Sequence, residues 1–102
     1  MIAVTMSSDE AAELLGRYRE HIDECDAALV KILARRFEIT EKVGELKALV
    51  ELPAADPARE AAQVASLHEL AEAEGLNPEV AESVWRHIVE LVKARHREIA
   101  GK

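Results

Sequence analysis

The chain has 102 residues, which is enough for one domain and no more. Its formal net charge of −7 argues against nucleic acid and against anionic membrane surfaces as partners. Apolar residues make up 49% of the chain but aromatic residues only 3%, so Leu, Ile, Val and Ala must fill any core. Glycine and proline are scarce, and this composition favours helices.

The longest apolar pattern starts near residue 15 and predicts one very long N-terminal helix. Apolar residues recur there in alternating steps of three and four, as at the a and d positions of a coiled coil. Ser7, Ser8 or Asp9 could each cap the helix, and Pro53 stops it. The positions of this repeat, called the seam below, are Leu15, Tyr18, Ile22, Cys25, Leu29, Ile32, Arg36, Ile39, Val43, Leu46 and Val50.

The predicted length of this helix indicates a dimer. About 40 residues at about 1.5 Å each extend roughly 60 Å. A compact domain of this size has a radius of gyration of only about 13 Å. The seam on the overhanging part needs a cover, and a second copy of the chain is the simplest one. We therefore expect an intertwined helical homodimer.

Two shorter helices are predicted after the break "LPAADPARE", residues 52–60. Asp56 before Pro57 and Asn77 before Pro78 each combine an N-cap residue with a proline in the first turn. Gly75 is typical of the position just after a helix C-terminus. The second helix is thus expected over about 57–74. The third is expected from the cap at Asn77 and Pro78 nearly to Gly101.

The fold class predicted is all-α, with three helices per chain in a single domain. The domain covers residues 1–102, of which residues 1–8 are expected to form a flexible N-terminus. The apolar positions expected to face inward are Val64, Leu67, Leu70 and Ala71 in the second helix and Val80, Ala81, Val84, Trp85, Ile88, Leu91, Val92 and Ile99 in the third.

The sequence also indicates a location. No apolar run approaches membrane-spanning length, and the N-terminus lacks the basic and apolar regions of an export signal. The single cysteine, Cys25, offers no disulfide within the chain. We expect a cytoplasmic protein.

Motifs of covalent, metal and phosphate chemistry are lacking. No nucleophile motif of the GxSxG type occurs, and no glycine-rich loop could cradle a phosphate. His21, His68, His87 and His96 do not have the spacing of metal ligands. We expect neither a metal nor a cofactor, which leaves cations in unusual positions as the candidates for chemistry.

Arg36 is the one charged residue in the seam. An unpaired charge on a buried surface costs several kcal/mol, so Arg36 needs an anion, either a glutamate or a ligand. Lys47 follows eleven residues later, about 20° from the same direction and about 16 Å along the axis. Both side chains could therefore grip a small anion. Arg59 lies in the first turn of the second helix, near free amide donors. The alternative interpretation is that Lys47 and Arg59 are ordinary surface charges.

Arg19 adds a geometric constraint. It precedes Arg36 by roughly 25 Å along the same helix, so the two cannot easily touch one small ligand from one chain. In an antiparallel dimer, Arg19 of one chain could meet Arg36 of the other.

Four segments of the chain resemble the all-helical class of chorismate mutase. They are "YREHIDECDAALVKILARR", "VGELK", "DPARE" and "GLNPEVAESVWRHIVE". Each is weak alone, but four in order at compatible spacings are specific, and the similarity covers residues 15 to about 96. The resemblance implies an interlocked dimer with two active sites, each completed by an arginine from the neighbouring chain, in which chorismate is rearranged to prephenate.

The resemblance implies roles for the three cations of the first helix. Arg19 is donated to the partner's site, Arg36 binds a substrate carboxylate, and Lys47 contacts both a carboxylate and the ether oxygen. Under this interpretation Arg36 interrupts the seam because a substrate dianion is its partner. The chemistry agrees, since a Claisen rearrangement needs a dianion held in a reactive conformation and cations near the breaking C–O bond.

At the other end of the substrate, the resemblance implies that Asp56 and Glu60 hold the ring hydroxyl and that Arg59 helps to close the site. Glu60 could pair with an amino group as readily. Isochorismate-pyruvate lyase and the mutase acting on 4-amino-4-deoxychorismate, which share the fold, therefore remain alternatives. A non-catalytic helical dimerisation module is the alternative from another class, and it predicts a protein carboxylate as the partner of Arg36.

The last predicted helix departs from the family pattern. The family commonly places a serine and a glutamine four residues apart there, and this chain has Val92 and His96. The glutamine normally donates a hydrogen bond to the ether oxygen, and His96 can donate in its place. Two alternatives stay open: His96 is a solvated residue near a fraying C-terminus, or Arg95, which points nearer the centre of the apolar stripe, supplies the donor.

Overall fold

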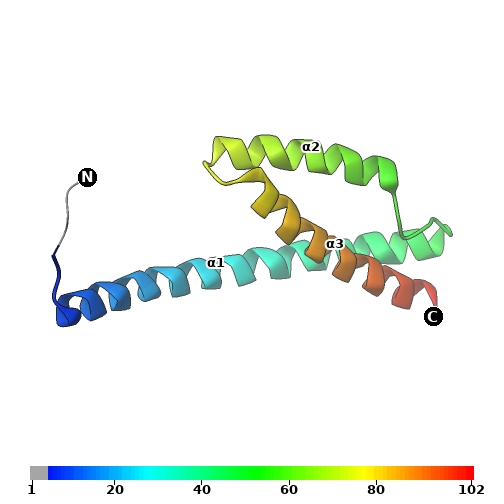
Figure 1. Cartoon of the computed structure of the whole chain (residues 1–102). Helices are drawn as coiled ribbons and strands as arrows, with labels where there is room; N and C mark the ends of the chain where they lie inside the picture. Colours follow the sequence, from blue (N-terminus) through cyan, green and yellow to red (C-terminus); the bar gives the residue numbers. More distant parts are fainter. Residues whose placement is uncertain (1–4) are drawn as a thin grey trace. The chain divides into compact units, whose positions relative to one another are not determined.

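The computed structural model describes residues 5–102 and contains three α-helices in that range (Figure 1). They are α1 (Ser8–Leu49), α2 (Pro57–Ala73) and α3 (Pro78–Ala100). The described part of the chain has no strand, so the predicted all-α class and the three predicted helices are confirmed. None of these helices combines the length and apolarity that crossing a bilayer requires.

Ser7 caps the first helix. Its hydroxyl accepts the backbone N–H of Glu10 at 3.1 Å and donates to the Glu10 carboxylate at 3.1 Å. Of the segment predicted to be flexible, residues 1–4 lie outside the described residues. Ser7 and Ser8 instead belong to the start of the helix.

The same turn ends α1 and α2. Leu52 donates to the carbonyl of Lys47 at 2.8 Å, and Leu76 donates to that of Ala71 at 2.8 Å. Such a closing bond needs a left-handed residue just before the donor. Gly75 fills this position after α2 with φ 72°, as predicted, whereas Glu51 fills it after α1 with φ 56°. Pro53 follows and cannot continue a helix.

The described chain divides into two units at residues 36 and 37, and α1 runs through the boundary. The N-terminal unit, described from residue 5 to Arg36, is a helical segment of α1. Its large apolar seam residues are 46–58% exposed, and they are Leu15, Tyr18, Ile22, Leu29 and Ile32. The seam predicted from sequence is therefore present here as an open apolar stripe.

The C-terminal unit, residues 37–102, holds the last turns of α1 together with α2 and α3. The two shorter helices form an antiparallel hairpin (Figure 1), because Glu60 pairs with Lys93 at one end and His68 with Glu82 at the other. Ala71 and Trp85 are the buried apolar residues of the described chain.

Several positions predicted to face inward are exposed. Two packed helices cover only one side of each other, so the rest of a wide apolar stripe stays open. The exposed positions are Leu70 (62%), Val80 (48%), Val84 (54%) and Leu91 (51%). The predictions for Ala71, Ala81, Trp85, Ile88 and Val92 agree with their buried or half-buried state.

Candidate active site

Arg36, the last residue of the N-terminal unit, carries a buried polar atom without a partner. Its side chain is half-buried, and its Nη1 atom has no hydrogen-bond partner among residues 5–102. None of the ion pairs in that part of the chain includes Arg36. An unsatisfied buried donor costs about 1–3 kcal/mol, and more when it is charged. The anion that the sequence requires is thus not supplied by a described carboxylate of this chain.

Arg19 lies in the same unit and is exposed. Among residues 5–102 it forms no ion pair. It shares α1 with Arg36 but lies seventeen residues before it, roughly 25 Å along the axis.

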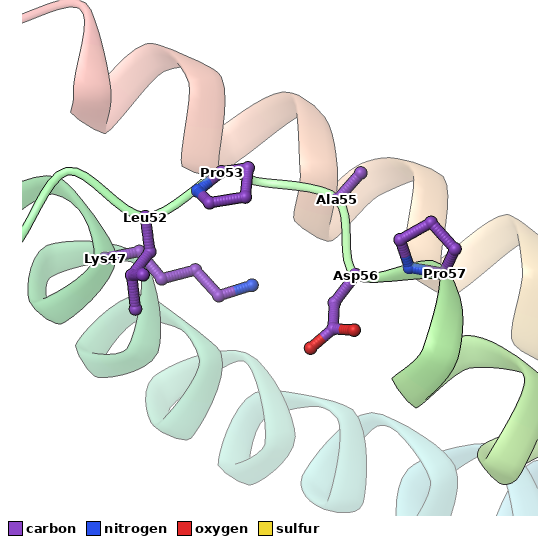
Figure 2. Close-up of a pocket in the computed structure, with 6 residues that line it drawn as sticks. All are labelled: Lys47, Leu52, Pro53, Ala55, Asp56 and Pro57. Atoms are coloured by element: carbon purple, nitrogen blue, oxygen red, sulfur yellow. The ribbon is translucent and has the colours of Figure 1, made fainter.

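Lys47 and Asp56 lie on one pocket of the C-terminal unit. Figure 2 shows the Lys47 ammonium and the Asp56 carboxylate pointing into the same space from opposite sides. Lys47 also donates to the carbonyl of Ala54 at 3.3 Å, which holds its long side chain across the turn after α1. The pocket has a volume of about 360 Å³ and is lined by Lys47, Leu52, Pro53, Ala55, Asp56 and Pro57.

Asp56 is also the N-cap of α2. Its Oδ1 atom accepts the backbone N–H of Arg59 at 3.1 Å, and Pro57 occupies the first helical position, as predicted. The Arg59 side chain is exposed. The cap thus fixes the start of α2 beside the pocket and places Arg59 one turn further along.

Glu60 forms an ion pair that was not predicted. Its Oε1 atom lies 2.7 Å from the Nζ atom of Lys93 on α3, and both side chains are half-buried. No signal in the sequence pointed to Lys93, which lies outside the apolar stripe predicted for the third helix. The hydrogen bond to Glu60 raises the pKa of Lys93 above its ordinary value.

His96 is buried rather than solvated. It is 5% exposed, and its Nε2 atom lies 2.7 Å from the backbone carbonyl of Thr40. The ring packs on Gly44 so closely that a Cβ atom there would lie 2.6 Å from Cδ2 of His96. The alternative of a solvated residue near a fraying helix end is therefore wrong. His96 joins α3 to the last turns of α1.

The Arg95 guanidinium forms ion pairs with two carboxylates. Its Nη2 atom lies 2.6 Å from Oε1 of Glu41 on α1, and its Nη1 atom lies 3.1 Å from Oε2 of Glu98. The hydrogen bonds from Arg95 hold the pKa of Glu41 below its ordinary value and raise the pKa of Arg95. Arg95 is therefore already engaged, whereas Val92, at the position of the family's serine, is half-buried and has no polar side-chain group.

Comparison with known proteins identifies the family. A profile of the family described as chorismate mutase type II matches residues 18–97. The chain belongs to this family. The matched range contains every predicted site residue from Arg19 to His96.

Two T-proteins are relatives of this chorismate mutase type II chain. One, from Enterobacter agglomerans, is 42% identical over 71 residues, which is 70% of this chain and 19% of the relative. The other, from Haemophilus influenzae, is 30% identical over 90 residues, which is 88% of this chain and 24% of the relative. The chain thus spans only about a fifth to a quarter of the length of these relatives.

Proposed function

We propose that this chain rearranges chorismate to prephenate. Family membership supplies the reaction class, and the observation that carries the proposal is the Nη1 atom of Arg36, which is buried and unpartnered among residues 5–102. A substrate carboxylate is the anion that this guanidinium lacks. Charge-assisted contacts between arginine and carboxylate are among the stronger hydrogen bonds in proteins.

The protein needs only to hold the substrate in its reactive conformation and to place positive charge near the ether oxygen. The ether C–O bond breaks as a new C–C bond forms within one molecule, and no proton is transferred. Holding the flexible dianion in its reactive conformation removes an entropic barrier. Fixed cations then stabilise the negative charge that builds on the ether oxygen.

We assign the roles that the family pattern implies. Arg36 binds one carboxylate of the substrate, and Lys47 contacts a carboxylate and the ether oxygen. The position of Lys47 on a pocket shared with Asp56 supports this assignment (Figure 2). Asp56 and Glu60 hold the ring hydroxyl, and Arg59, on the first turn of α2, closes the site.

At the ether oxygen, His96 acts as the second donor in place of the usual glutamine. Val92 lines the site without donating, because its side chain is apolar. His96 is held by Thr40 and Gly44, so its ring has a defined orientation.

We further propose that the chain acts as a homodimer with shared sites, to which Arg19 is contributed by the partner. The open seam of the N-terminal unit supports this, since its large apolar residues are 46–58% exposed in the single chain. A contiguous exposed apolar surface of this kind marks a protein interface. The lone Cys25 supports a cytoplasmic location for the enzyme.

The experiment that tests the proposed function is incubation with chorismate and with isochorismate, followed by product analysis. We expect prephenate from chorismate, and we expect Arg36→Ala to abolish its formation. Arg35→Ala is the matched control, because Arg35 is the exposed neighbour of Arg36 on the same helix. Release of pyruvate from isochorismate would assign the chain to the lyase, and inertness toward both would leave the dimerisation module.

A further inference from the structure

The ion pair between Glu60 and Lys93 joins a predicted substrate ligand to a residue that the family pattern does not include. The Lys93 side chain is 19% exposed and that of Glu60 28%, and their charged atoms are 2.7 Å apart. Lys93 also reaches the Oε1 atom of Glu90, but at 3.5 Å and with a far more exposed partner. Glu60 is therefore the principal partner of Lys93.

The ion pair determines which carboxylate oxygen of Glu60 is free to bind a ligand. Lys93 occupies Oε1, and no hydrogen bond to Oε2 occurs among residues 5–102. A carboxylate in an ion pair has only lone pairs to offer, so Glu60 is an acceptor and not a donor. A ring hydroxyl can donate to the open oxygen without meeting a like charge.

A ring ammonium meets a different environment. It would share one carboxylate with Lys93, and two cations on the two oxygens of one carboxyl group lie within about 4–6 Å of each other. At that range like charges repel appreciably even when solvent screens them. The attraction of Glu60 for the second cation is reduced as well, because Lys93 already neutralises its charge.

We infer that Lys93 is a specificity-determining residue, which acts through Glu60 and makes the site select a ring hydroxyl over a ring ammonium. The inference rests on the proposed function and resolves the question that Glu60 alone leaves open. It assigns the chain to hydroxyl-bearing dicarboxylates and not to 4-amino-4-deoxychorismate. Lys93 is a positioning residue, since its partner is Glu60 and not the reacting atoms.

The raised pKa of Lys93 supports this reading. Because its hydrogen bond to Glu60 stabilises the ammonium, Lys93 stays charged throughout the pH range in which histidines and carboxylates titrate. The selection against an ammonium is thus not expected to change between pH 6 and 9.

The test compares kcat/KM for chorismate and for 4-amino-4-deoxychorismate in the parent and three variants. We expect the parent to prefer chorismate and Lys93→Met to lower this preference about tenfold. Lys93→Arg keeps the charge and should keep the preference. Lys42→Met is the matched control, because Lys42 is an exposed lysine of α1 without an ion pair among residues 5–102, and its preference should equal that of the parent.

A merely structural role for Lys93 would lower kcat/KM for both substrates alike and leave their ratio unchanged. Lys93→Gln gives the same comparison with an uncharged hydrogen-bond donor, should Lys93→Met fold poorly. A parent enzyme that is active on chorismate while its ratio is unmoved in both uncharged variants overturns the inference alone. A parent that prefers the amino substrate also overturns it. A parent inactive on both substrates overturns the proposed function, and the inference falls with it.

Discussion

His96 donates its Nε2 proton to the backbone carbonyl of Thr40 at 2.7 Å, and this contact determines what the other ring nitrogen can do. A carbonyl oxygen only accepts, so Nε2 must carry the hydrogen. In the neutral ring Nδ1 then has a lone pair and can only accept. Nδ1 becomes a donor only when the ring is an imidazolium.

We therefore predict that a glutamine is at least as good a donor as His96 at this position. The neutral ring already gives its one N–H to Thr40, whereas a glutamine amide carries two N–H donors. His96→Gln should therefore keep substantial activity, measured as kcat/KM for chorismate in the variant and in the parent.

The control is His87→Gln, since His87 is an exposed histidine of the same helix. Its kcat/KM should equal that of the parent. His96→Ala should lower kcat/KM, because alanine removes the ring and supplies no donor. If His96→Ala is folded and as active as the parent, His96 serves only to join α3 to α1.

Gly44 provides a second test of the same contact. A Cβ atom at Gly44 would lie 2.6 Å from Cδ2 and 3.0 Å from Nε2 of His96. We expect Gly44→Ala to lower the free energy of unfolding by about 1–3 kcal/mol, because the ring must move and its bond to Thr40 is strained. Urea denaturation measures the change.

Gly16→Ala is the matched control for Gly44→Ala. It lies in the same helix, and a Cβ atom there would meet nothing within 4 Å. Alanine is the better helix former, so we expect Gly16→Ala to raise the free energy of unfolding by up to about 1 kcal/mol. Equal stabilisation by both substitutions would show that the approach of His96 to Gly44 is not tight.

Local signals in the sequence were sufficient to predict the helices. Asp56 caps α2, Asn77 caps α3, and Gly75 ends α2 with a positive φ, because each of these depends only on neighbours along the chain. The unusual status of Arg36 was also predictable, since a charge within an apolar repeat needs an anion. The end of α1 was predicted from Pro53, but the left-handed residue there is Glu51, which has no such preference.

Contacts between helices were harder to predict from the sequence. The pairing of Lys93 with Glu60 and of His96 with Thr40 depends on the register in which two helices pack, and an apolar stripe fixes the face but not the register. The exposure of Leu70 has a related cause. Apolar periodicity identifies a face that can be buried, but it does not say how many neighbours a single chain provides for it.

The ion pair of Arg95 and Glu41 predicts a specific loss of stability in acid. Hydrogen bonds from Arg95 lower the pKa of Glu41 from its ordinary value of 4.5. A carboxyl group whose pKa is lower in the folded state stabilises the fold above the unfolded value. That contribution is lost as pH falls through the lower, folded value. We expect Arg95→Met to lower Tm at pH 7, and the difference from the parent to shrink steadily below about pH 4.5.

Arg97→Met is the control for this measurement, because Arg97 is exposed on the same helix and forms no ion pair among residues 5–102. Its Tm should follow that of the parent at every pH. A deficit in Arg95→Met that is the same at pH 3 and pH 7 would show that the side chain stabilises by packing alone.

The open seam predicts the oligomeric state. Light scattering should give about twice 11.3 kDa at micromolar concentration. Ile32→Glu places a charge within the seam and should dissociate or unfold the dimer. Val30→Glu is the matched control, because Val30 is 65% exposed on the same helix but lies outside the seam. A folded monomer in the parent, or equal behaviour of the two variants, would contradict a dimer built on this surface.

The last prediction concerns the two chains that build one site. If Arg19 acts in the partner's site and Lys47 in its own, then Arg19→Ala and Lys47→Ala are each inactive as homodimers. A heterodimer of the two has one site with both defects and one site with neither. Mixing the variants and allowing the subunits to exchange at random should restore about a quarter of the parental activity, since half of the dimers then carry one intact site of two. The control is a mixture of Lys47→Ala with Arg36→Ala, two residues assigned to the same chain's site, in which every heterodimer site keeps a defect and no activity returns. If the first mixture stays inactive after exchange has been verified by mass spectrometry, Arg19 and Lys47 act from one chain, and the shared site is wrong.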